Sequence, residues 1–235
     1  MKILKYSFVL LIVVALGGCA AITPNFGVKK DFWQDKSATI GVAIAKLPKA
    51  QAFKSGSQGL LDIAINNANA DDLEKALNTV DITSVNQLAA KMTSYLQQKG
   101  FRVKQIAAPI DVAKLADFEK QNDDAKSVFY SKKNFAALKS SLGVDKLVLV
   151  SVNIVGTIRS YYGFIPLGDP SGYAALNGTV INLSNNQMEW NQLVTQTVAH
   201  DPGDWDKPPQ FSSLTKAMKL AYVQSQSILL NDFTQ

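Results

Sequence analysis

Residues 147–152 read Leu-Val-Leu-Val-Ser-Val, an apolar run that lacks the alternation of a half-exposed strand. A run of this kind is typical of a strand that is covered on both faces. It can continue as far as Tyr161 or Tyr162. The chain is therefore expected to build a sheet around this segment, with other parts of the chain packed on its two sides.

The first half of the chain predicts a strand, helix and strand in succession. Residues 38–44 are small or β-branched and read as a buried strand, and residues 54–59 read as a polar loop. A helix is expected from Thr83 or Ser84, because apolar residues then recur at helical spacing until Gly100. Residues 101–106 alternate apolar with polar side chains, as a half-exposed strand does.

Two more helices are expected before the apolar run. Residues 111–120 have a helical pattern, and Ser131 can cap a second helix that carries Phe135, Leu138 and Leu142. Gly143 then suits the end of that helix.

The last part of the chain predicts a hairpin followed by a helix. Residues 173–183 and 187–198 form strand-like arms around the polar turn 184–186, and residues 214–230 form an amphipathic helix. The expected fold is therefore an α/β (α+β) domain, with a single mixed sheet, helices packed on it, and a C-terminal β-hairpin followed by a helix.

The N-terminus has the pattern of an export signal. Lys2 and Lys5 precede an apolar core that is too short to span a bilayer, and Gly17-Gly18 leads directly to Cys19. The alternatives are a plain signal peptide with an incidental cysteine and an uncleaved membrane anchor. Cys19 is the only cysteine, so a disulfide-stapled fold is excluded and stability must come from an apolar core.

The segment that ends at Cys19 resembles a bacterial lipobox. This resemblance implies that Cys19 becomes the acylated first residue of the mature protein and attaches it to a membrane. Ala20 follows the cysteine, whereas Asp at that position resembles an inner-membrane retention signal, so we expect a periplasm-facing protein of the outer membrane. The expected domains are a signal peptide over 1–18, a lipidated tether over 19–36 and an envelope domain over 37–235.

The charge of the chain excludes one class of partner. Loss of residues 1–18 removes Lys2 and Lys5 and leaves 22 basic against 19 acidic residues. This balance gives no basic stripe for binding nucleic acid, and an export signal argues against that partner independently.

Few residues suggest chemistry. His200 is the only histidine, and it lies close to Asp201, Asp204 and Asp206, which together could bind a divalent cation. However, the spacing is not that of an EF-hand loop, and neighbouring prolines favour a stiff surface turn. Residues 55–59 superficially resemble a serine-nucleophile turn but lack the Gly-x-Ser-x-Gly order. We expect no enzyme activity and no cofactor.

Residues 161–173 are rich in aromatics, glycine and proline, and we expect an irregular segment. One interpretation folds its rings over the sheet edge as part of the core. The other makes Tyr161, Tyr162, Phe164 and Ile165 a contact surface for a partner, because exposed Tyr and Phe are efficient anchors.

A family resemblance covers most of residues 38–233. It is carried by Gly143-Val144-Asp145-Lys146 before the apolar run, and by a hairpin whose second arm begins Gln187-Met188-Glu189-Trp190. In order and pattern the chain resembles the domain shared by the amino-terminal part of TolB, the curli-secretion channel lipoproteins and the penicillin-binding-protein activator lipoproteins. The resemblance implies a small docking module of the cell envelope without catalytic residues.

Two functions follow from these features. The first is a non-catalytic adapter or assembly factor that positions an envelope protein complex, as a monomer or a small oligomer. The second is an oligomeric component of an outer-membrane secretion channel, which would require strands of about 9 to 11 residues that face lipid. The segments near 60–65 and 101–110 are short or interrupted for that purpose, so the adapter is preferred.

Overall fold

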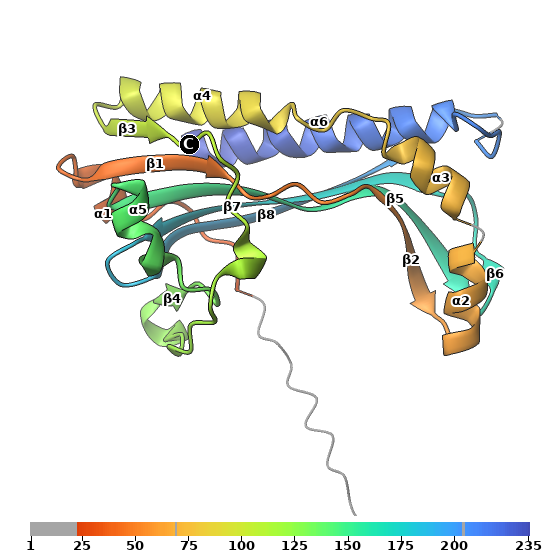
Figure 1. Cartoon of the computed structure of the whole chain (residues 1–235), viewed down its shortest axis with the longest axis horizontal. Coiled ribbons are helices and arrows are strands. Elements are labelled where there is room, and N and C mark those ends of the chain that lie inside the picture. The colour runs from red at the N-terminus through yellow and green to blue at the C-terminus, as the bar shows by residue number, and fades with distance from the viewer. Residues whose placement is uncertain (1–22, 69, 204) are drawn as a thin grey trace, which may run out of the picture.

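The computed structural model describes residues 23–68, 70–203 and 205–235. One mixed sheet runs through them in the order β3-β1-β5-β7-β8-β4, and β2 and β6 pair with the far part of β5 (Figure 1). The strands are β1 (Thr39–Ile44), β2 (Gln51–Ser57), β3 (Arg102–Gln105), β4 (Phe129–Tyr130), β5 (Lys146–Tyr162), β6 (Ile165–Pro166), β7 (Ser171–Asn182) and β8 (Gln187–Ala199). The α-helices are α1 (Lys30–Gln34), α2 (Leu60–Ala68), α3 (Asp71–Leu77), α4 (Val85–Gln98), α5 (Lys139–Leu142) and α6 (Ser212–Thr234).

The sheet is mixed, as expected. β1 pairs in parallel with β3 and β5, and β2 also pairs in parallel with β5. β5, β7 and β8 form an antiparallel meander, and the β7–β8 hairpin is followed by α6. The α+β class and the C-terminal hairpin with its helix are therefore confirmed.

Helices α4 and α6 cover one face of the sheet (Figure 1). Val148, Val150 and Val152 of β5 belong to the core on this side, together with the fully buried Trp190 of β8. One stripe of α6 contributes Met218, Ala221, Tyr222, Leu229 and Phe233 to this core, and Leu214 packs in a separate small cluster with Ala76 and Phe211. A Cβ atom at Gly178 of β7 would lie 2.2 Å from the Trp190 ring, so glycine is required where the indole crosses the strand.

A second, smaller core covers the opposite face at one end of the sheet. Leu147 and Leu149 of β5 pack there with Phe129 and Phe135. Residues 147–150 are thus buried on both sides, as the apolar run predicts. Farther along β5, the alternate residue Asn153 is exposed, so this face opens toward the middle of the sheet.

The extents predicted for the two helices before β5 are wrong. Residues 111–120 contain only a 3-10 turn at Val112–Lys114, because the chain then pairs with residues 132–134. Phe118 N–H donates to Lys132 O at 2.8 Å, and Asn134 N–H donates to Ala116 O at 2.8 Å. Backbone groups used in this way cannot form a continuous helix.

The helix expected from Ser131 begins later, and Asn186 gives the physical reason. Its buried side chain accepts a hydrogen bond from Phe135 N–H at 2.8 Å and donates to Ser131 O and Lys133 O, both at 2.9 Å. These bonds hold residues 131–135 in a turn. A 3-10 turn at Phe135–Leu138 and the single turn α5 follow, ended by Gly143 as expected.

Two segments expected to be irregular are partly strands. Residues 54–59 are polar, yet β2 pairs with the far part of β5 at the edge of the sheet, where polar side chains can meet water. Residues 161–173 include the end of β5, the two-residue strand β6 and the start of β7. The turn at Gly163 has φ 59°, so glycine lets β5 fold back on β6 there.

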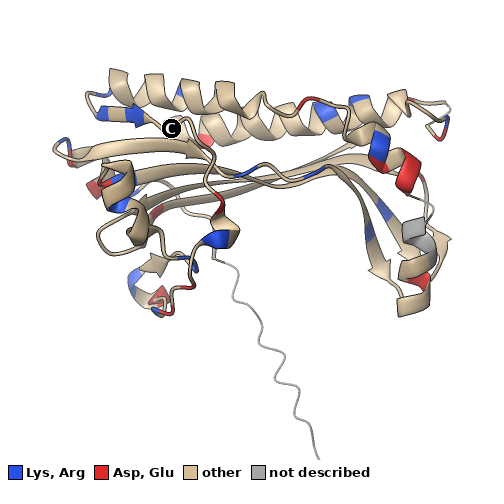
Figure 2. Ribbon diagram, viewed as in Figure 1, with Lys and Arg blue, Asp and Glu red and all other residues tan. Residues whose placement is uncertain are grey.

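Residues of both charges are interspersed along the chain at the two ends of the molecule (Figure 2). No helix within the described ranges combines the length and the apolar character needed to cross a bilayer.

Candidate functional site

The segment that connects the N-terminus to the sheet is packed rather than free. Cys19 lies outside the described residues. Thr23 already lines a hollow on the face opposite α4 and α6, beside Ser151 and Asn153 of β5. Residues from Thr23 onward, which were expected to belong to a tether up to residue 36, therefore lie against the domain.

Backbone and side-chain hydrogen bonds fix this segment to β8. Asn25 Nδ2 donates to Leu193 O at 3.1 Å, and Leu193 N–H donates to Asn25 Oδ1 at 2.9 Å. Phe26 N–H donates to Asn191 O at 2.8 Å, and Asn191 Nδ2 donates to Pro24 O at 3.0 Å. The segment thus covers part of the open edge of β8.

Helix α1 is held by rings and by a buried charge. Phe32 is fully buried and stacks on Phe101 at 5.4 Å between ring centroids. Lys146 Nζ lies 2.9 Å from Glu189 Oε2 and 3.5 Å from Asp35 Oδ2. A hydrogen bond from Ser37 lowers the pKa of Asp35, and the charge of Lys146 lowers it further. Phe32 and Trp33 therefore pack on the domain.

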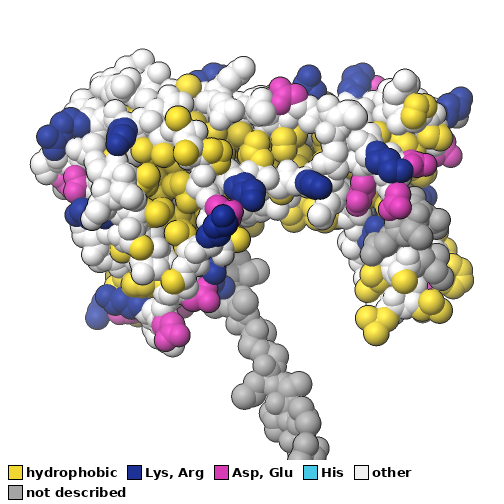
Figure 3. Space-filling model, in the orientation of Figure 1, with side chains coloured by type: hydrophobic (Ala, Val, Ile, Leu, Met, Phe, Trp, Pro, Cys, Tyr) yellow, Lys and Arg dark blue, Asp and Glu magenta, His cyan; other side chains and the backbone are white. Residues whose placement is uncertain are grey.

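The far end of the molecule carries a cluster of exposed apolar side chains, which we call the distal tip. Its exposed fractions are 90% at Leu60, 73% at Leu61, 41% at Ile63, 69% at Tyr162, 62% at Phe164, 52% at Ile165 and 59% at Leu167. The tip combines the start of α2 with the turn between β5 and β6. Figure 3 shows apolar atoms gathered at the lower right of the molecule, where the distal tip lies.

Local bonds hold the two parts of the distal tip together. Gly163 N–H donates to Ser57 O at 2.8 Å, which joins the β5–β6 turn to the end of β2. Asp62 accepts a hydrogen bond from Gly59 N–H at 2.8 Å at the start of α2. A Cβ atom placed on Gly163 would lie 3.6 Å from the Asp62 carboxylate, so the turn and the helix are neighbours.

Three of the four residues expected as a partner contact lie in the distal tip, namely Tyr162, Phe164 and Ile165. Tyr161 is partly buried and faces the neighbouring pocket instead. The alternative, in which these side chains fold over the sheet edge as part of the core, is not consistent with the exposure of Tyr162, Phe164 and Ile165. Sequence reasoning missed the α2 residues of the tip, although the apolar pair Leu60-Leu61 after Gly59 was a visible signal.

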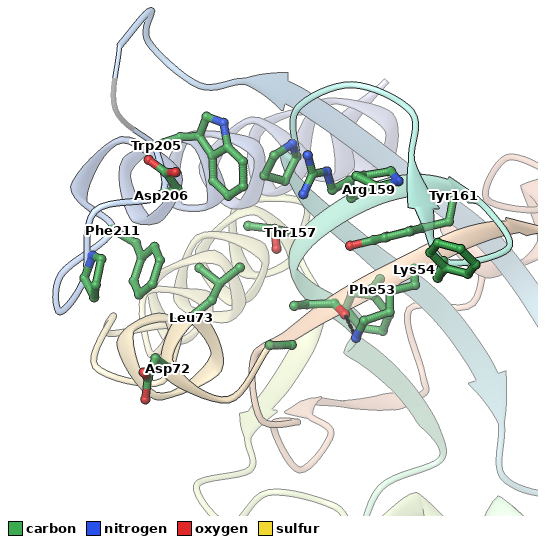
Figure 4. Close-up of a pocket in the computed structure, with 16 residues that line it drawn as sticks. Phe53, Lys54, Asp72, Leu73, Thr157, Arg159, Tyr161, Trp205, Asp206 and Phe211 are labelled. Carbon is green, nitrogen blue, oxygen red and sulfur yellow. Dashed lines mark hydrogen bonds between the residues drawn. The ribbon is translucent and has the colours of Figure 1, made fainter. Parts of the chain in front are cut away.

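A pocket of about 380 Å³ lies beside the distal tip, between the β2–β5–β6 edge, α3 and residues 205–211. In Figure 4, Trp205, Phe211 and Leu73 form one wall, and Arg159 and Tyr161 lie on the other side. The Arg159 guanidinium lies 4.9 Å from the centre of the Trp205 ring, and its Nε donates to Gly168 O at 2.7 Å.

Lys54 adds a second cation to this pocket. Its Nζ donates to Ala52 O at 3.2 Å. Burial lowers the pKa of Lys54, while the charges of Glu74 and Asp71 act in the opposite direction. Rings and cations in one hollow suit binding by stacking and charge.

The segment around His200 forms separate contacts at the surface. His200 Nε2 lies 3.5 Å from Asp169 Oδ2, and Lys216 Nζ lies 2.6 Å from Asp201 Oδ2. The hydrogen bond from Lys216 lowers the pKa of Asp201. Asp204 lies outside the described residues. Among the residues that the structure does describe, no three His, Cys, Asp or Glu side chains converge as metal ligands.

The serine-rich segment 55–59 lies in β2 and the loop after it. Ser55 Oγ lies 3.1 Å from Ser160 Oγ on β5. A hydroxyl pair across two strands supplies no base for a nucleophile.

No protein-family model matches the sequence, and no curated protein is similar to it. Several solved structures do match. Lipoprotein GNA1162 from Neisseria meningitidis is 14% identical, and the match covers 81% of this chain and 99% of that one, with a TM-score of 0.32. A dodecamer of PelC from Paraburkholderia phytofirmans is 9% identical, with coverage of 91% and 95% and a TM-score of 0.31.

The C-terminal domain of LpoB from Salmonella enterica also matches and is 11% identical. The match covers 67% of this chain and 81% of that one, with a TM-score of 0.20. At these identities the likeness concerns the fold alone.

Proposed function

We propose that this chain is a membrane-anchored lipoprotein that acts without catalysis as an adapter or assembly factor for a cell-envelope protein complex. The proposal is supported chiefly by the short connection between Cys19 and the domain. Only residues 20–24 separate Cys19 from Asn25, which is hydrogen-bonded to β8. At about 3.3–3.6 Å per residue, this connection spans roughly 20 Å at most. An acylated Cys19 therefore keeps the domain next to the membrane.

The proposed location is the periplasmic side of the outer membrane. Each buried CH₂ of an acyl chain contributes about 0.8 kcal/mol, so two or three chains on Cys19 give durable attachment. Ala20 follows Cys19 and lacks the carboxylate of the inner-membrane retention pattern.

The side chains near the pocket support binding rather than reaction. Arg159 is held by Gly168 O and the Trp205 ring, and Ser55 faces another hydroxyl. A nucleophile needs an adjacent base, and a general base must reach the proton that it removes. The pocket instead offers apolar and cationic contact surface, and Asp72 and Asp206 add two carboxylates to its lining.

The adapter function is tested by cross-linking the lipidated full chain in native membranes and isolating it under denaturing conditions. We expect one envelope protein in fixed ratio to the chain, and its loss when Cys19→Ser prevents anchoring. The matched control is Leu220→Ser, which alters an exposed residue of α6 and leaves the anchor intact. Recovery of the chain without any protein partner would contradict the adapter function.

Native mass measurement in detergent separates the adapter from the secretion-channel alternative. The adapter is expected as a monomer or a small oligomer. A ring of many copies would instead favour the channel component.

A further inference from the structure

The distal tip is unusual because its exposed side chains are almost all large and apolar. Seven such residues lie within two short segments, and Asp62 is the single charged residue among positions 59–63 and 162–168. The Asp62 carboxylate accepts a hydrogen bond from Gly59 N–H. Contiguous exposed apolar surface of this kind marks a contact with a protein or with lipid.

The direction in which the distal tip projects distinguishes these two occupants. Strand β2, helix α2 and strand β6 bend away from the layer formed by α4 and α6 (Figure 1). The N-terminal segment docks on that same side of the sheet, because Thr23 lines the hollow opposite the helices. The distal tip and the start of the described chain therefore lie on one side of the molecule.

The number of residues between Cys19 and Asn25 limits how far this side of the sheet can lie from the lipid. Asn25 is bound to β8, and five residues connect it to Cys19. The bilayer surface is thus within roughly 20 Å of the point where Asn25 docks, if Cys19 carries the lipid. Because the distal tip projects on the same side of the sheet, it comes close to the bilayer surface.

We propose that the distal tip enters the lipid bilayer and forms a second membrane contact beside the acylated Cys19. This inference rests on the proposed function, because it requires the lipid anchor. Leucine, isoleucine and phenylalanine suit the acyl region, and Tyr162 suits the interface, where a ring meets both lipid and water. Phe164 and Ile165 are thus assigned to lipid rather than to a protein partner.

Two attachments at separate points, one at the middle of β8 and one at the distal tip, set the orientation of the whole domain. One attachment alone would not fix the orientation of the domain. With both in place, the hollow face of the sheet looks toward the bilayer, and α4 and α6 look away from it. The exposed α6 residues Leu220 and Val223 then face the aqueous compartment.

A fluorescent label tests this orientation in the lipidated full chain. Acylation blocks the thiol of Cys19, which is the only cysteine, so one introduced cysteine can be labelled selectively. An environment-sensitive nitrobenzoxadiazole dye is placed at Ile165→Cys or, independently, at Leu61→Cys. Leu220→Cys is the matched control, since its exposed fraction of 46% is close to the 52% of Ile165. The protein is reconstituted into vesicles of phosphatidylethanolamine and phosphatidylglycerol.

We expect a blue shift and a several-fold rise in emission at positions 165 and 61, with quenching by lipids that carry a spin label on the acyl chain. The label at position 220 should remain in water. If 165 and 61 stay in water while the protein is bound to the vesicles, the inference is overturned and the anchor stands. If they are shielded only in native membranes, a protein occupies the tip and the inference is equally overturned. Failure of the protein to bind vesicles would instead remove the anchor on which both proposals depend.

Discussion

Asn25 pairs with the backbone of Leu193 through both ends of its side-chain amide, at 3.1 Å and 2.9 Å. The amide thereby acts like one residue of an additional strand along the edge of β8. This pairing determines where the N-terminal connection meets the sheet, and so how far the domain can lie from a lipid on Cys19.

Substitution of Asn25 by alanine should loosen the N-terminal segment without unfolding the domain. Two hydrogen bonds are lost, and each contributes about 0.5–1.5 kcal/mol net. We expect faster hydrogen exchange at the amide of Leu193, which can be followed by NMR. Gln34→Ala, at an exposed position of α1, is the control and should leave this amide protected. Unchanged exchange in Asn25→Ala would show that the pairing does not hold the segment.

Lys146 and Glu189 should matter for stability chiefly because each compensates the buried charge of the other. The two side chains are 6% and 11% exposed and their charged atoms are 2.9 Å apart. Lys146→Met leaves a buried carboxylate without its partner and should cost about 3–5 kcal/mol. The double variant Lys146→Met with Glu189→Leu should lose much less. Urea unfolding measures both, and equal losses in the single and double variants would contradict this interpretation.

Acid should destabilise the domain partly through Asp145. Its carboxylate accepts a hydrogen bond from Thr39 N–H at 3.0 Å, and this bond lowers its pKa below the ordinary value of 3.8. A carboxyl with a lower pKa in the folded state stabilises the fold above pH 3.8, and this contribution disappears as pH falls through the folded value. Asp145→Asn should therefore flatten the decline of unfolding free energy below pH 3.8. An unchanged decline would exclude Asp145 as a source.

The distal tip should be dispensable for folding. Phe164 and Ile165 are 62% and 52% exposed, so Phe164→Ser with Ile165→Ser should change the unfolding free energy by only about 0.5 kcal/mol per site. By contrast, Leu176→Ala in the fully buried part of β7 should cost about 2–5 kcal/mol. Thermal unfolding of both variants measures the two losses of stability. A large loss of stability in the tip variant would place these side chains in the core.

The sequence predicts those parts of the fold whose pattern is set by burial. The continuous apolar run of β5, the alternation in β3 and the apolar stripes of α4 and α6 all follow from the faces that these elements cover. The β7–β8 hairpin was also predictable, because a polar turn separates two long strand-like arms.

The sequence does not predict elements that depend on distant partners. Residues 131–135 have a helical pattern, yet the side chain of Asn186, far along the chain, holds them in a turn. Strand β2 is polar and contains Gly56, whose φ of 100° accommodates close contact with Tyr161 O. Such pairings at a sheet edge leave little hydrophobic signal in the local sequence.

One half of the distal tip stands out in the sequence, whereas the signal of the other half is ambiguous. The aromatic segment around Phe164 stands out by composition, whereas Leu60 and Leu61 resemble the start of an ordinary buried helix. Their exposure follows from the position of α2 beyond the end of the sheet (Figure 1), which only the three-dimensional arrangement reveals.

Metabolic labelling with palmitate tests whether Cys19 carries a lipid. We predict that label enters the wild-type chain, that the protein fractionates with membranes, and that Cys19→Ser abolishes both. Absence of label in the wild-type protein, or a fully processed Cys19→Ser protein that still fractionates with membranes, would show that Cys19 is not the membrane anchor.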